Sequence, residues 1–124
     1  MKVLHVKDGM YSAGFTLIVN CKANKFDNYL KKRYELFSVE KTATSTKGRL
    51  ITVTCDDHVD YIIWVENFSW HINEQALLMH ELLHYCFAVL DRVGISLVEE
   101  SEEAYTYYVQ RMMEYTWFKL KDLK

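Results

Sequence analysis

The six residues MHELLH, numbers 79–84, carry the side chains of this sequence that are best suited to metal chemistry. His80 and His84 are four residues apart, so on a helix they lie on one face and can direct both imidazoles at one ion. Glu81 follows the first histidine directly, where a carboxylate can reach a water bound to that ion. The pattern predicts a zinc (Zn²⁺) site with His80 and His84 as ligands and Glu81 as the catalytic base.

The residues around this motif predict a helix buried in the middle of the protein. The helix is expected to begin at an N-cap at Asn73 and to end near Arg92, with Gly94 as a left-handed C-cap. Apolar residues occupy most of its sides. A buried His or Glu without a partner costs on the order of 1–3 kcal/mol, and a metal with its water would satisfy all three polar side chains. The alternative is a metal-free domain whose histidines are hydrogen-bonded in the core.

A catalytic zinc needs a third protein ligand beside an open position. Four glutamates follow the helix and are candidates for it: Glu99, Glu100, Glu102 and Glu103. Glu99 is expected to form a capping box with Ser96 (S-L-V-E). Glu102 and Glu103 fall in the first turn of the last helix, which could return antiparallel and bring either carboxylate to the metal. Acidic residues at a helix start also favour the dipole, so most of this cluster is explained as solvated.

The stretch H-E-L-L-H, followed by E-E-A-Y, resembles the gluzincin branch of the zincin metallopeptidases. The resemblance covers residues 73 to about 112 and extends to short zincin-type proteins encoded by phages and prophages. It implies that His80, His84 and Glu103 bind zinc, with Glu102 as the reserve ligand. It also implies that Glu81 activates a zinc-bound water. The implied function is a zinc-dependent hydrolase, namely a small metallopeptidase.

The sequence departs from the pattern of these families at several positions. The Asp expected four residues after the ligand Glu is Tyr107, and Leu90 stands where metzincins have a third His. No further subdomain is expected to supply an oxyanion donor, and the nearby candidates for that role are Tyr105, Tyr107, Tyr108 and His71. These departures leave open a second hypothesis, a non-catalytic zincin-fold protein that binds a protein partner.

The elements that must position the motif are expected in the order strand, strand, helix, strand, strand, helix, helix. The predicted strands span 3–6, 15–21, 49–55 and 59–66, with a tight turn at 56–58, and the predicted helices span 23–37, 73–92 and a last one from 98 or 101 to 120. This order predicts a single α+β domain, 1–124, with residues 1–68 as the sheet plus first helix and 70–124 as the metal-binding helical part. The sheet is expected to be mostly antiparallel with helices on one face. The strand YIIWVE is expected at the sheet edge that borders the cleft.

Composition narrows the remaining possibilities. Seventeen acidic and fifteen basic residues give a net charge of −2, so no nucleic-acid partner is expected, and the basic face of the first helix is interpreted as solvated. No apolar run is long enough for a signal peptide or a membrane span. Three scattered cysteines indicate a reducing cytoplasm, including that of a bacterial host. His5 and His58 show no ligand spacing, and Cys86 is expected in the core.

Overall fold

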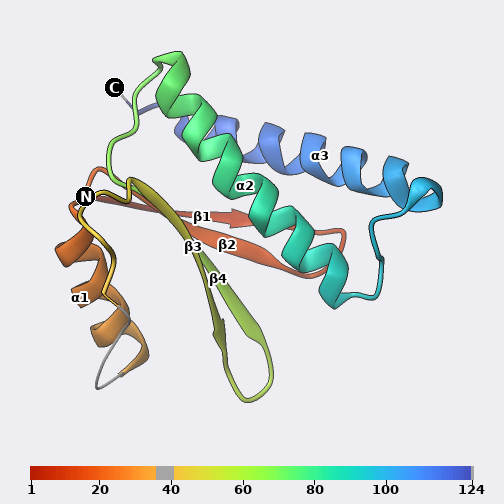
Figure 1. The fold of residues 1–124 in the computed structure, drawn as a ribbon, viewed down its shortest axis with the longest axis horizontal. Helices are drawn as coiled ribbons and strands as arrows, with labels where there is room; N and C mark the ends of the chain where they lie inside the picture. Colours follow the sequence, from red (N-terminus) through yellow and green to blue (C-terminus); the bar gives the residue numbers. More distant parts are fainter. Residues whose placement is uncertain (36–40, 124) are drawn as a thin grey trace.

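The computed structural model describes residues 1–35 and 41–123, which form an α+β fold with a four-stranded sheet and three α-helices (Figure 1). The elements in chain order are β1 (Lys2–Lys7), β2 (Gly14–Val19), α1 (Ala23–Tyr34), β3 (Gly48–Thr54), β4 (Val59–Val65), α2 (Ile72–Arg92), the 3₁₀-helix η1 (Glu99–Ser101) and α3 (Glu102–Leu120). The α+β class and the four strands are therefore confirmed. The predicted end of the first helix, including Phe37, lies outside the described residues.

The sheet is mixed, with the strand order β1-β2-β4-β3. The pairs β1–β2 and β3–β4 are antiparallel, whereas β2 and β4 run parallel. A parallel pair needs a crossover connection, and here the chain between β2 and β4 contains α1 and β3. The prediction that YIIWVE forms a sheet edge is wrong, because β4 lies between β2 and β3. The edge strand of this hairpin is β3.

Helices cover both faces of the sheet, so the prediction of helices on one face is also wrong. One apolar cluster joins β2 and β4 to α2 and α3, and a second joins the opposite sides of the same strands to α1 (Figure 1). Ile63 of β4 belongs to the first cluster, while Ile62 and Trp64 belong to the second. Trp64 stacks on Phe26 of α1 with ring centroids 5.1 Å apart. Because β4 is apolar at consecutive positions, each of its faces needs a covering layer.

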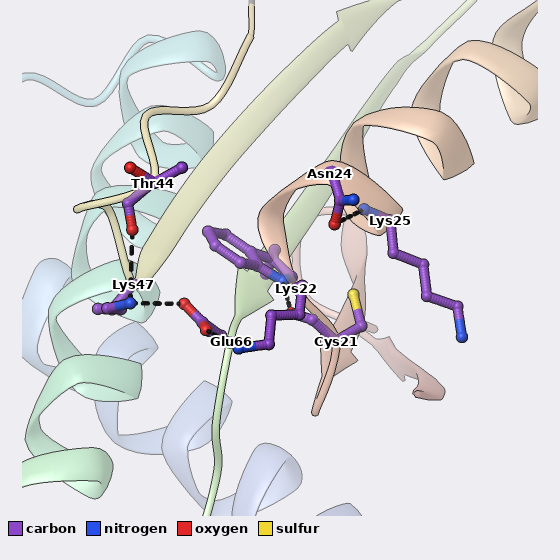
Figure 2. Close-up of polar contacts among 8 residues, drawn as sticks. Cys21, Lys22, Asn24, Lys25, Thr44, Lys47 and Glu66 are labelled. Atoms are coloured by element: carbon purple, nitrogen blue, oxygen red, sulfur yellow. Dashed lines mark hydrogen bonds and ion pairs between the residues drawn. The ribbon is translucent and has the colours of Figure 1, made fainter.

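A buried carboxylate fixes the start of β3. Figure 2 shows Lys47 and Lys22 approaching Glu66 from two sides, with nitrogen–oxygen distances of 3.0 Å and 3.8 Å. The backbone N–H of Glu66 also donates to the Lys47 carbonyl at 2.8 Å. Both lysine side chains are largely exposed, so these ion pairs orient the chain more than they stabilise it. These contacts of Glu66 hold the first residues of β3 against the end of β4, next to α2.

The ends of α2 are set by the backbone. The N-cap is His71 rather than the predicted Asn73, and it makes no side-chain capping hydrogen bond. At the other end Gly94 adopts φ +90°, as predicted. The N–H of Gly94 donates to the Asp91 carbonyl at 3.0 Å and that of Ile95 donates to the Leu90 carbonyl at 2.9 Å. This pair of bonds is a Schellman motif, which turns the chain sharply toward α3.

The start of α3 differs from its prediction in detail. The N-cap of η1 is Val98, so Ser96 does not form the predicted capping box with Glu99. The hydroxyl of Ser101 accepts the Val98 N–H at 3.0 Å instead and donates to the Ser96 carbonyl. The buried face of α3 has helical spacing and consists of Tyr105, Tyr108, Met112, Thr116 and Leu120. In residues 1–35 and 41–123, no helix is both long enough and apolar enough to cross a membrane.

Candidate metal centre

His80 and His84 lie side by side on α2. Their Nε2 atoms are 3.1 Å apart, and the ring planes meet at 79°. A tetrahedral zinc that holds two imidazole nitrogens at about 2.0–2.1 Å places them roughly 3.3 Å from each other. A separation of 3.1 Å is that of a hydrogen bond between the two rings, and it is also close to the separation at a shared ion.

The burial of α2 differs from the prediction. His80 and His84 are exposed and belong to a solvent-facing stripe that also contains Asn73, Ala76, Phe87 and Asp91. The helix packs one side against β3 and β4 and another against α3, which leaves this third side open. The cost of burying unpaired polar groups therefore applies to Glu81 and not to the histidines. Exposure suits a site that has to admit a substrate.

Glu81 is the buried member of the motif, with 6% of its surface exposed. Burial raises the pKa of its carboxyl group, while the adjacent His80 and His84 and a hydrogen bond from the Leu50 backbone N–H lower it; burial dominates. Gly48 makes room for this side chain. A Cβ on Gly48 would lie 3.3 Å from the Leu77 side chain and 3.4 Å from the Glu81 Cγ. The strand thus approaches α2 closely because residue 48 has no side chain.

The site lies at the edge of β3 that faces away from β4. The Lys47 carbonyl accepts from Glu66, and the Cys55 N–H donates to His58 at 2.8 Å, so residues 47 and 55 point toward β4. Because backbone groups alternate along an antiparallel ladder, Gly48, Leu50 and Thr52 point away from β4. An open depression of about 380 Å³ lies at this edge, lined by Gly48, Arg49, Leu50, Glu81 and His84. Arg49, which no sequence motif singles out, is one of the lining residues, and its guanidinium donates to the Thr42 hydroxyl at 2.9 Å.

The predicted third ligands lie apart from this pair. Glu102 and Glu103 are exposed in the first turn of α3. Within the part of the chain that the structure describes, one trio of His, Cys, Asp or Glu ligand atoms lies mutually within 4.8 Å, and it consists of Cys55, His58 and Asp60. Neither glutamate thus completes the histidine pair in this arrangement.

The candidate oxyanion donors are mostly engaged elsewhere. The Tyr105 hydroxyl donates to the Ile95 carbonyl at 2.5 Å, and the Tyr108 hydroxyl donates to Asp8 at 2.8 Å. Tyr107 is exposed, and the Cζ atom of Arg111 lies over its ring, 5.8 Å from the ring centroid. His71 is the exposed N-cap of α2. None of these four lines the depression beside Glu81.

Comparison with known proteins yields no matching family model, no similar curated protein and no similar solved structure. The function must therefore be inferred from the chemistry of the motif and from the arrangement of the side chains around it.

Proposed function

We propose that this protein is a zinc-dependent hydrolase, a small metallopeptidase in which His80 and His84 bind the metal and Glu81 is the base. One observation carries the proposal. Two imidazole nitrogens 3.1 Å apart lie next to a buried carboxylate, and His84 and Glu81 line the same open depression. Bound zinc would lower the pKa of a water molecule and polarise the substrate carbonyl.

Glu81 is suited to accept and return a proton. Its burial raises the pKa of the carboxyl group, which brings its proton affinity closer to that of a base working near neutral pH. The Leu50 N–H holds the carboxylate in one orientation from the side of β3. Close approach of this strand depends on Gly48. The base is therefore positioned by the sheet as well as by its own helix.

The substrate we propose is an extended peptide or protein segment. Gly48 and Thr52 direct backbone groups out of the sheet edge, and such groups can pair with an added strand. The depression between this edge and His84 would then receive the scissile carbonyl. Gly48, Leu50 and Glu81 line the same depression.

Glu103 is our proposed third ligand, with Glu102 as the reserve. Both are exposed at the start of α3, so their carboxylates are free to take up a new contact. Phe87 of α2 packs on Tyr105 of α3 with ring centroids 5.7 Å apart, which keeps the start of α3 beside the helix that carries the histidines. Ligation requires the first turn of α3 to move toward His84.

The experiment combines zinc analysis with a peptide-library assay. Wild type and Glu81→Gln should each hold zinc at the histidine pair, whereas hydrolysis should fall by about 10²- to 10⁴-fold in Glu81→Gln. Glu100→Gln is the matched control, because Glu100 is an exposed glutamate outside the site. Hydrolysis that survives in Glu81→Gln would refute the role of this residue.

A second candidate is a non-catalytic zincin-fold protein that binds a protein partner. Two observations favour it: the third ligand is not assembled, and apolar side chains near the end of α2 are exposed, namely Phe87, Leu97 and Val98. Zinc binding without hydrolysis of any library peptide would support this candidate over the enzyme. For either function we propose a reducing cytoplasmic setting, since Cys21, Cys55 and Cys86 are all unpaired.

A further inference from the structure

We propose a second metal site, independent of the proposed hydrolase centre, at the turn between β3 and β4. Its ligands are Cys55, His58 and Asp60, and its ion is Zn²⁺. The candidate ligand atoms of these three residues all lie within 4.8 Å of one another. The turn is at the opposite end of β3 from Leu50, roughly 15 Å away at about 3.3 Å per residue. The two sites are therefore separate.

The hairpin register brings these residues together. The Cys55 N–H donates to the His58 carbonyl at 2.8 Å, so these two residues face each other across the turn. Asp60 follows His58 by two residues and therefore shares its face of the strand. Cys55, His58 and Asp60 thus form a triangle on one face of the hairpin.

Two neighbouring groups already orient the donors. The Asp57 carboxylate lies 2.5 Å from the His58 Nδ1, which leaves the Nε2 atom for a metal. The Tyr34 hydroxyl donates to Asp60 Oδ2 at 2.9 Å, which leaves Oδ1 for a metal. The His58 Nε2 and Asp60 Oδ1 are 3.2 Å apart. Carboxylates that hold the far nitrogen of a ligand histidine are a regular feature of zinc sites.

The donor set fits zinc in particular. Thiolate, imidazole and carboxylate are all zinc ligands, and three protein ligands plus water complete a tetrahedron. Tetrahedral donors lie about 3.3–3.8 Å apart, so small side-chain rotations close the present triangle. A bound metal ion would cross-link the two strands.

Hydrogen bonding without a metal is the competing explanation. His58 lies between Asp57 and Asp60 in an exposed turn, and exposed ion pairs contribute little to stability. In that explanation the Cys55 thiol donates to the Val53 carbonyl at 4.0 Å and takes no part in the contacts of His58. The thiolate therefore provides the distinguishing signal.

The test is a Co²⁺ titration of the double variant His80→Ala/His84→Ala, followed by absorption spectroscopy. One equivalent of Co²⁺ should produce a thiolate-to-cobalt charge-transfer band, and Zn²⁺ should abolish it. Cys55→Ser should remove the band, and His58→Ala should weaken binding by at least about 10-fold. Asp56→Asn is the matched control, since Asp56 is exposed in the same turn without being a ligand. It should bind Co²⁺ as the parent does.

Three outcomes would overturn the proposal. These are a band that persists in Cys55→Ser, cobalt binding without any thiolate band, and no binding by the folded parent at stoichiometric metal. Circular dichroism confirms folding, and the exposed His58 provides a variant that does not disturb the core. Because the α2 histidines are absent from this background, failure here leaves the hydrolase proposal intact. Failure of the hydrolase proposal likewise does not affect the proposal of a metal site at the turn.

Discussion

The α2 histidine pair and the Cys55–His58–Asp60 trio bring donor atoms together by different means. On α2, one turn of helix places two imidazoles 3.1 Å apart without help from any other element. At the β3–β4 turn, three donors converge because of hairpin register, and side chains from Asp57 and Tyr34 hold two of them. The first arrangement is visible as a sequence spacing. The second depends on which residues pair across strands.

The two sites also differ in what surrounds the donors. Glu81 is buried beside the histidines, and its pKa is raised by that burial. The carboxylate next to His58 belongs to Asp57, whose side chain is 88% exposed and whose pKa is lowered by its hydrogen bond to His58. A buried carboxylate of raised pKa suits proton transfer, whereas an ionised one suits holding an imidazole in place. This difference is why we propose catalysis at α2 and a structural ion at the turn.

The largest expected effect comes from removing one imidazole of the α2 pair. In a Cys55→Ser background, where the turn site is disabled, His84→Ala should weaken zinc binding by more than about 100-fold. This exceeds the 10–100-fold typical of groups that merely orient a ligand. Isothermal titration with Zn²⁺ measures the change. His71→Ala removes an exposed histidine from the N-cap of the same helix and should bind zinc normally. Equal zinc affinity in His84→Ala and His71→Ala would show that the α2 histidine pair is not a zinc site.

The next effect separates Glu103 from Glu102. If Glu103 completes the α2 site, Glu103→Gln should lower zinc affinity by about 10–100-fold in the same background, because a neutral amide is a poor zinc ligand. Glu102→Gln is its neighbour and matched control, with little change expected. A loss in Glu102→Gln instead would assign the ligand to the reserve residue. Unchanged affinity in both would show that the resemblance to gluzincins does not extend to α3.

A smaller effect is expected at Gly48, which borders Glu81 but not the turn. Gly48→Val forces methyl groups against Leu77 and Glu81, where even a Cβ would lie 3.3–3.4 Å from them. Overpacking of this kind costs about 1–3 kcal/mol, which a urea unfolding curve detects. Thr52→Val adds a similar side chain at an exposed position of the same strand and should be nearly neutral. Unchanged stability in Gly48→Val would mean that α2 shifts freely away from β3.

Local features of this fold are predictable from the sequence. The Gly94 C-cap, the turn at 56–58 and the buried stripe of α3 each depend on a few neighbouring residues. The order of the strands cannot be predicted from neighbouring residues, because the parallel pairing of β2 with β4 arises from contacts between distant segments. The run YIIWV nevertheless carries a signal of burial on both faces, since it is apolar at every position.

The two proposed metal sites differ in the same respect, namely whether neighbouring residues or distant contacts bring the ligands together. The His80–Glu81–His84 pattern is found from spacing because helical periodicity is fixed. The position of Glu102 and Glu103 relative to the histidines cannot be found from spacing, because it depends on how α3 packs against α2. The turn trio has no recognisable spacing along the chain. The expected turn at 56–58 would place Cys55 opposite Val59, whereas the observed register places Thr54 opposite Val59 and Cys55 opposite His58. The trio could therefore not be predicted from that turn.

The smallest expected effect concerns the charge on Glu81 in metal-free protein. Because burial raises the folded-state pKa of this carboxyl group, the folded protein holds a proton that the unfolded chain releases. The resulting stabilisation is fully present below the unfolded-state pKa and is lost as the pH rises through the folded-state pKa. Glu81→Gln keeps the acceptor for the Leu50 N–H but cannot ionise. Its free energy of unfolding should therefore exceed that of wild type at pH 7, and the difference should shrink toward pH 4.

Urea unfolding of both proteins in a chelator, at several pH values, measures this difference. Glu100→Gln provides the control, because Glu100 is exposed and its substitution should give a curve parallel to that of wild type. A Glu81→Gln variant that is less stable than wild type at pH 7 would mean that the His80 and His84 charges and the Leu50 N–H outweigh burial. In that case Glu81 would resemble Asp57 at the turn, an ionised group that holds its neighbours in place, and the assignment of proton transfer to α2 would lose its physical basis.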